Sequence, residues 1–123
     1  KTDRHDYPVM LTRDQILAAD DLPRELVKVP EWGGDVYVKT ITGAERDRWE
    51  IQIATSSKKP SSETIRAALA AMTVCDENNR LLFTQDDIEA LSNKSAAPLD
   101  RVFQVAMRLN HISQSAVEEL EKN

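Results

Sequence analysis

Histidine and cysteine, which often supply a base or a nucleophile near neutral pH, are scarce in this chain. Its 123 residues include two histidines and one cysteine. His5 lies near the start, and His111 follows Asn110 at an expected junction between two helices. A nucleophile needs a base within hydrogen-bond reach, and one cysteine with two distant histidines is not a zinc ligand set. The sequence therefore predicts no catalytic residue, no metal site and no cofactor, and we expect that the chain is not an enzyme.

Two further patterns resemble ligand-binding loops but lack required residues. The run Asp76–Asn78 begins like a calcium loop, which needs glycine at its sixth position and glutamate at its twelfth. This chain has Leu81 and Asp87 at those positions. The Gly33-Gly34 pair has no lysine and serine after it and no helix opening on it, so it is not a phosphate-binding loop. We expect neither a calcium site nor a nucleotide site.

Composition and charge restrict the partners that the chain can have. The 16 basic and 21 acidic residues give a net charge of −5, with a pI near 5.0. The basic residues are scattered, whereas a nucleic-acid-binding domain usually has a basic face. No apolar run approaches the 18 residues of a membrane helix. Cys75 lies in an apolar stretch and is expected to be a buried free thiol, which fits a reducing compartment. These features predict an intracellular protein that binds neither nucleic acid nor membrane.

Helix starts are recognisable because a capping side chain precedes each apolar pattern. Thr12 with Gln15 and Thr42 with Glu45 have the spacing of capping boxes. Apolar pairs that could close a hydrophobic staple flank three of the caps. The expected N-cap residues are Thr12, Thr42, Ser61 or Ser62, Thr84, Ser95 and Ser113. The pattern predicts five or six helices, with wide apolar stripes on the helices that follow Ser62 and Ser95.

Two short strands are predicted early in the chain. Residues 25–29 and 35–41 alternate in polarity and flank Pro30–Gly34, a run of turn-forming residues. A second hairpin is expected to fold about Asp76–Asn79. The fold class that follows is α+β, mainly helical, with about five or six helices and one or two small β-hairpins. Residues 1–10 are expected to be a disordered leader or an added segment, and residues 11–123 a single domain.

Candidate contact residues come from one helix and one turn. On a helix from Ala44, Trp49 and Ile53 lie close together, and Ile51 points to roughly the opposite side. A helix that is apolar on two sides is buried in its own domain or shared with a partner. Trp32, in the turn, either packs over its hairpin or stands exposed as an anchor. We take Trp32, Trp49, Ile51 and Ile53 as candidate partner-binding residues.

Several runs are similar to one family. Pro-Glu-Trp-Gly-Gly at residues 30–34, followed by Thr-Gly-Ala-Glu-Arg at 42–46, is distinctive, and residues 11–21, 82–91 and 117–123 are similar as well. Across residues 11–123 the chain resembles the tail assembly chaperones of long-tailed bacteriophages. The resemblance implies a non-catalytic protein that binds the tape-measure protein and keeps it soluble while the tail tube polymerises. It also implies action in the host cytoplasm and absence from the mature virion. The acidic surface together with exposed apolar side chains predicts self-association into a homo-oligomer.

Proteins of this family are typically made in two lengths, the longer by a programmed frameshift. The extension is thought to recruit the tail-tube protein. Depending on its codons, the ending Glu121-Lys122-Asn123 can encode a slippery heptanucleotide, so we hypothesise that the frameshift site lies there. Two alternatives remain open from the sequence. One is a structural tail component retained in the virion, and the other is an acidic regulatory adaptor that acts on host machinery.

Overall fold

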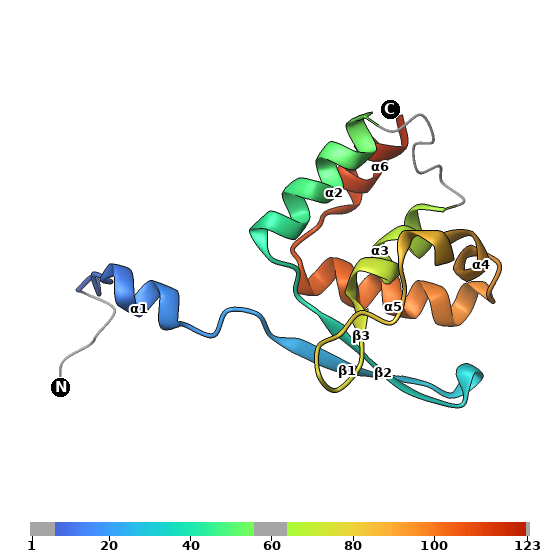
Figure 1. The fold of residues 1–123 in the computed structure, drawn as a ribbon, viewed down its shortest axis with the longest axis horizontal. Helices are drawn as coiled ribbons and strands as arrows, with labels where there is room; N and C mark the ends of the chain where they lie inside the picture. Colours follow the sequence, from blue (N-terminus) through green and yellow to red (C-terminus); the bar gives the residue numbers. More distant parts are fainter. Residues whose placement is uncertain (1–6, 56–63, 123) are drawn as a thin grey trace.

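The fold is α+β and mainly helical, as predicted (Figure 1). The computed structural model describes the backbone of residues 7–55 and 64–122 and the side chains of residues 7–51 and 64–119. These residues form six α-helices, two short 3₁₀ helices and one three-stranded antiparallel sheet in the order β1-β2-β3. Helices α3 and α5 pack together and against the sheet, so the core lies between helices and strands.

The predicted first hairpin is confirmed. Strand β1 (Arg24–Val29) pairs with β2 (Gly34–Lys39), with Val29 opposite Gly34 and Arg24 opposite Lys39. The 3₁₀ helix η2 (Pro30–Trp32) connects the strands and ends at Gly33, whose φ of 84° suits glycine. Val27, Val29 and Val38 are buried on the face of the hairpin that meets the helices.

The second predicted hairpin forms only in part. Strand β3 (Val74–Cys75) pairs antiparallel with β2, but the returning segment contributes a single bridge between Cys75 and Leu81. The turn between them closes on the Asp76 carboxylate, which accepts the backbone N–H groups of Asn78 and Arg80. Cys75 is a buried free thiol, as expected, and burial raises its pKa.

Helices α3 (Ile65–Thr73) and α5 (Ala96–Leu109) form the centre of the helical layer. The predicted α5 stripe is buried at Leu99, Val102, Phe103 and Ala106. Helix α3 is more deeply buried than a single stripe would require. Its alanines are buried on several sides, namely Ala67, Ala68, Ala70 and Ala71. Small side chains let neighbouring elements approach α3 from more than one direction.

Three shorter elements complete the body of the domain. The 3₁₀ helix η3 (Gln85–Asp87) leads into α4 (Ile88–Ser92), which packs on α3. Helix α2 (Gly43–Thr55) follows the hairpin, and α6 (Gln114–Lys122) follows α5. Both contribute to the core, α2 through Trp49 and α6 through Val117.

The predicted N-cap residues are confirmed at four helix starts. Thr12 with Gln15 and Thr42 with Glu45 form complete capping boxes. Thr84 forms one with Asp87, although the first turn is 3₁₀. The Ser113 hydroxyl accepts the backbone N–H of Ala116 at the start of α6. Ser95 lies at the N-cap position of α5 without a side-chain cap bond. The cap expected at Ser61 or Ser62 lies outside the described residues.

Helix α1 (Arg13–Ala18) forms at its predicted position but stands away from the other elements (Figure 1). None of its residues is buried. Its staple pair, Leu11 and Ile16, is 61% and 55% exposed, so the staple shields little apolar surface. Residues 7–23, which we call the N-terminal arm, therefore carry apolar side chains outside the core.

The C-terminal end of α5 is a Schellman motif formed without glycine. The N–H of Ile112 donates to the Met107 carbonyl, and the N–H of His111 donates to Arg108. This places His111 at a φ of 52°. A left-handed conformation costs a residue with a Cβ atom about 1–2 kcal/mol. Glycine avoids this strain, but its larger conformational entropy in the unfolded state offsets part of the gain in stability.

We expect His111→Gly to raise the free energy of unfolding by about 0.5–1 kcal/mol, because glycine adopts this conformation without strain. Urea denaturation followed by circular dichroism measures the change. The matched control is His111→Ala, which keeps a Cβ at the strained position. A glycine variant no more stable than the alanine variant would contradict the assignment of strain to this residue.

Candidate partner-binding surfaces

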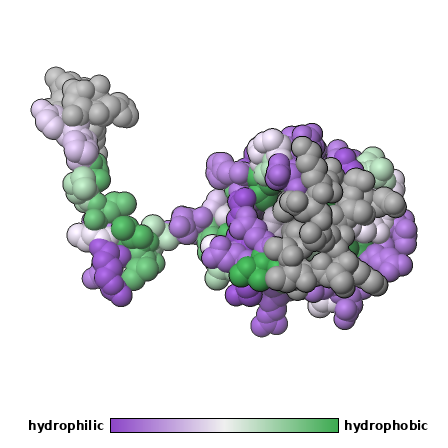
Figure 2. Space-filling model, turned by 90° about the horizontal axis from the view of Figure 1, so that it is seen from above, coloured by the Kyte–Doolittle hydropathy of each residue, from purple (hydrophilic) through white to green (hydrophobic). Residues whose placement is uncertain are grey.

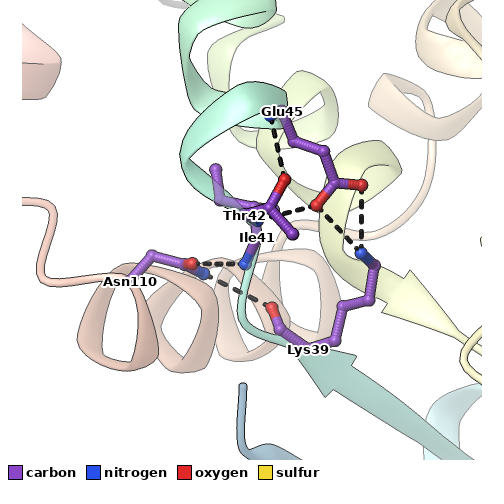
Figure 3. Close-up of polar contacts among 5 residues, drawn as sticks. All are labelled: Lys39, Ile41, Thr42, Glu45 and Asn110. Atoms are coloured by element: carbon purple, nitrogen blue, oxygen red, sulfur yellow. Dashed lines mark hydrogen bonds and ion pairs between the residues drawn. The ribbon is translucent and has the colours of Figure 1, made fainter. Parts of the chain in front are cut away.

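A partly buried polar junction fixes the direction in which α2 leaves the sheet (Figure 3). Thr42 and Glu45 cap the helix reciprocally, and the Glu45 carboxylate also accepts from Lys39 Nζ at 3.2 and 3.3 Å. Desolvation alone would raise the pKa of Glu45. The Thr42 N–H and the Lys39 ammonium outweigh it, so this pKa is lowered. The ionised carboxylate therefore ties the first turn of α2 to the end of β2.

Asn110 completes the junction from the other side. Its side-chain oxygen accepts the Ile41 N–H at 2.8 Å, and its amide donates to the Ala106 carbonyl at 2.9 Å and the Lys39 carbonyl at 3.4 Å. Only 8% of Asn110 is exposed. The backbone N–H of Ile41 lies between strand and helix, where neither element supplies an acceptor, so Asn110 supplies it.

Helix α2 carries its candidate residues on two different sides. Trp49 is 8% exposed and belongs to the core, whereas Ile51 is 61% exposed. The predicted opposition of these two side chains is therefore confirmed. The side chain of Ile53 lies outside the described residues. The structure thus assigns Trp49 to packing, whereas Ile51 is exposed on the surface. Partner binding by these residues stays a prediction.

Trp32 is half-buried and lines a shallow groove at the end of the hairpin. The groove has a volume of about 220 Å³. It is formed by residues from η2 and from the segment around α4, namely Trp32, Phe83, Asp87, Ala90, Leu91 and Lys94. Its lining is mainly apolar and includes one acidic and one basic side chain. The indole thus packs against the core and also forms one wall of the groove.

Sequence reasoning identified Trp32 but not the groove, because the other wall comes from a segment more than 50 residues later in the chain. Phe83 directly precedes the expected N-cap Thr84, where an apolar residue fits a hydrophobic staple, so its apolar character did not point to a groove. The apolar arm was also missed. The sequence did contain a signal for it, the apolar pair Ile16 and Leu17 on the first predicted helix. Asp20, Asp21 and Pro23 follow closely and end that helix before it is long enough to pack on the core.

An ion pair holds η2 in place beside the groove. Arg101 of α5 makes a two-pronged contact with Glu31, with Nη1 and Nη2 each 2.7 Å from a carboxylate oxygen. Arg101 Nη1 also donates to the Lys28 carbonyl at 3.4 Å. The hydrogen bonds from Arg101 lower the pKa of Glu31 from 4.5 to about 2. Two-pronged arginine–carboxylate contacts fix orientation, so this pair sets the position of the neighbouring Trp32.

We expect Arg101→Gln to raise the pKa of Glu31 from about 2 toward 4.5. A carboxyl whose pKa is lowered by folding adds stability above pH 4.5, and that stability is lost as the pH falls toward about 2. NMR titration of the Glu31 side-chain carbon measures the shift. Arg108→Gln, which removes the similar pair with Glu25, is the control. An unchanged Glu31 pKa in Arg101→Gln would contradict the proposed cause.

The described residues offer little for metal chemistry. Within them, no group of three or more His, Cys, Asp or Glu side chains is arranged to hold a metal ion. His111 is exposed and serves the helix end described above. None of the described helices has the length and apolar character needed to cross a membrane.

Comparisons with known proteins point in one direction. The structure is similar to that of the bacteriophage HK97 tail assembly chaperone, with a TM-score of 0.55 and 22% identity over 78% of this chain and 94% of that one. At this identity the likeness concerns the fold. No curated protein matches the sequence. Residues 12–123 match the family described as phage tail assembly chaperone, which covers the sheet, both surfaces above and helix α1. The chain belongs to the phage tail assembly chaperone family.

Proposed function

We propose that this chain binds the tape-measure protein of its phage and keeps it soluble while the tail tube polymerises. The observation that carries the proposal is the family match over residues 12–123. A chaperone of this kind works through a binding surface and needs no catalytic residues, so its role is non-catalytic. It would act in the host cytoplasm and be absent from the mature virion.

The exposed side of α2 is the surface that we assign to the tape-measure protein. Ile51 is 61% exposed there, and Trp49 anchors the helix from beneath. A long helical client presents apolar stripes, and an exposed isoleucine on a helix with a fixed direction can pack against such a stripe. The junction of Glu45, Lys39 and Asn110 holds α2 in that direction. The net charge of −5 would keep the loaded complex dispersed.

The frameshift-extended form belongs to the same proposal. A longer product would use this domain to hold the tape-measure protein and its extension to recruit the tail-tube protein. The Glu121–Asn123 slip site stays a hypothesis. Reading the gene tests it, because a guanine in the third position of the Glu121 or Lys122 codon, or a closed −1 frame, would exclude slippage there.

The binding surface can be tested with purified protein. We expect Ile51→Ser to weaken binding to the tape-measure protein by about tenfold or more, because the contact loses its central apolar side chain. Glu50→Ser, at an exposed position about 100° around α2 from Ile51, is the matched control and is expected to bind nearly normally. Surface plasmon resonance with immobilised tape-measure fragments measures both. Equal binding by the two variants would remove this side of α2 from the proposal.

The absence from the virion is tested separately. Mass spectrometry of purified phage particles is expected to find tail-tube and tape-measure proteins but not this chain. Stoichiometric amounts of the chain in the particle would indicate a structural tail component instead.

A further inference from the structure

The groove beside Trp32, which we call the Trp32 groove, differs from the surface around it. On the face shown in Figure 2, the body of the domain presents mainly hydrophilic side chains, whereas the N-terminal arm is more apolar. The lining of the Trp32 groove is mainly apolar and includes Phe83, Ala90 and Leu91. A concave apolar site with a few polar groups is where proteins usually take up another molecule.

The volume of the groove fits one side chain better than a whole ligand. Pockets for free small molecules usually measure about 300–1,000 Å³, whereas this groove has a volume of about 220 Å³. A cavity of about 150 Å³ can hold benzene. The groove therefore has room for one large aliphatic or aromatic side chain, carried on the surface of a larger partner. Side chains that enter pockets in this way often dominate the affinity of an interface.

Both walls of the groove are held in place by the domain itself. The two-pronged contact between Arg101 and Glu31 positions Trp32 on one side. On the other side, Leu91 is 5% exposed, and Phe83 packs against the buried cluster. A partner side chain thus enters a site that is already formed, so that little ordering of the groove opposes binding.

The two charged side chains of the groove differ in what they already bind. One oxygen of the Asp87 carboxylate accepts the Thr84 N–H at 2.8 Å and the Thr84 hydroxyl at 3.4 Å, within the capping box. The ammonium group of Lys94 is exposed and forms no hydrogen bond or ion pair with any residue that the structure describes. An unpaired cation beside an apolar site favours a partner that carries a carboxylate.

The spacing of the lining residues indicates where that carboxylate would lie. Lys94 follows Leu91 by three residues and Ala90 by four, which is about one helical turn. On a partner helix, side chains three or four residues apart are neighbours on the surface. A helix with a large apolar residue and an Asp or Glu three or four positions away can therefore fill the groove and pair with Lys94 at the same time.

The position of the groove favours a long partner. Figure 1 shows helix α2 and the turn between β1 and β2, where Trp32 lies, on opposite sides of the body of the domain. Two contacts so far apart, one at Ile51 and one at the groove, suit an extended partner that crosses the domain better than a compact one. The tape-measure protein, which we assign to the exposed side of α2, is a partner of this shape.

We propose that the Trp32 groove is a second contact for the tape-measure protein. One large apolar side chain of that protein fills the groove, and a carboxylate one helical turn away pairs with Lys94. The inference rests on the proposed function for the identity of the partner. It adds a separate site on the other side of the domain from Ile51 and states the chemistry of the segment that binds there.

Filling the groove tests the apolar half of the contact. Ala90→Phe places a large side chain in the groove from an exposed position, and we expect it to weaken binding to tape-measure fragments by about tenfold or more. Glu89→Phe adds the same side chain at the neighbouring exposed position, which does not line the groove, and is expected to bind nearly normally. Surface plasmon resonance with immobilised, overlapping tape-measure fragments measures both, and circular dichroism verifies that each variant is folded.

Charge reversal tests the pairing with Lys94. We expect Lys94→Glu to weaken binding of the same fragment several-fold. The fragment whose acidic residue is changed to lysine is expected to lose affinity for the unmodified chain and to regain it with Lys94→Glu. Such a rescue identifies a direct pair, because a general change in net charge would not depend on one residue of the fragment. Lys28→Glu, the same reversal at an exposed lysine outside the groove, is the control.

The indole of Trp32 reports directly on the groove. The chain has two tryptophans, so Trp49→Phe leaves Trp32 as the only one. We expect a bound fragment to shift the fluorescence emission of Trp32, because it replaces water beside the indole. Normal fragment binding by either Ala90→Phe or Lys94→Glu, or binding that leaves the Trp32 emission unchanged, would overturn the groove contact while the proposed function stands. If no fragment binds the unmodified chain, the proposed function itself fails, and the groove contact fails with it.

Discussion

Trp49→Ala is expected to lower the free energy of unfolding by about 3–5 kcal/mol. Trp49 is 8% exposed and belongs to the same buried cluster as Leu69, Val102 and Val117. Its indole is the largest contribution of α2 to that cluster among the described side chains. Truncation leaves a cavity beneath the helix and removes the apolar area through which Trp49 holds α2 against the body of the domain.

The matched control for Trp49 lies two residues along the same helix. Ile51→Ala removes an exposed aliphatic side chain and is expected to change the free energy of unfolding by no more than about 0.5 kcal/mol. Guanidinium denaturation followed by circular dichroism measures both variants, with tryptophan fluorescence reporting on Trp32 alone in Trp49→Ala. A loss below about 1 kcal/mol for Trp49→Ala would show that α2 does not depend on this side chain.

Asn110→Ala is expected to cost about 1–3 kcal/mol. The substitution leaves the Ile41 N–H without its acceptor in a buried position and removes the donors to Lys39 and Ala106. A buried backbone N–H that loses its partner costs close to its full desolvation energy. Because the bonds join α5 to the start of α2, the loss is expected to loosen both elements together.

A second asparagine provides the control for Asn110. Asn93 ends α4 as Asn110 ends α5, but it is exposed. Asn93→Ala is therefore expected to change stability by only a few tenths of a kcal/mol. Hydrogen exchange of the Ile41 amide gives a local readout, which should accelerate in Asn110→Ala and not in Asn93→Ala. Equal effects of the two variants would contradict the role given to the buried amide.

Local chemistry explains the parts of the fold that the sequence predicted well. Thr12 and Thr42 each have a partner three residues later, and such capping boxes depend on neighbouring residues alone. The first hairpin also follows from local residues, since Pro30 and Gly33 fix the turn and alternating valines select the buried face. The opposition of Trp49 and Ile51 needs only the helical repeat.

Features that depend on distant segments were harder to predict. The groove needs Trp32 and the α4 segment together, and nothing in either segment reveals the other. The exposure of α1 is a similar case. An apolar pair such as Ile16 and Leu17 predicts a buried side, but not whether the burying surface belongs to the same molecule. The second hairpin, expected about Asp76–Asn79, is another case, because its returning segment makes a single bridge, between Leu81 and Cys75.

Co-expression tests whether this chain holds the tape-measure protein in solution. The tape-measure protein of the same phage is produced alone, with this chain, and with the Ile51→Ser variant, and its soluble fraction is measured after centrifugation. We expect the tape-measure protein to be insoluble when it is produced alone. With this chain it becomes soluble and co-purifies, and with the variant the soluble fraction falls. A tape-measure protein whose solubility is the same with and without this chain would contradict the account.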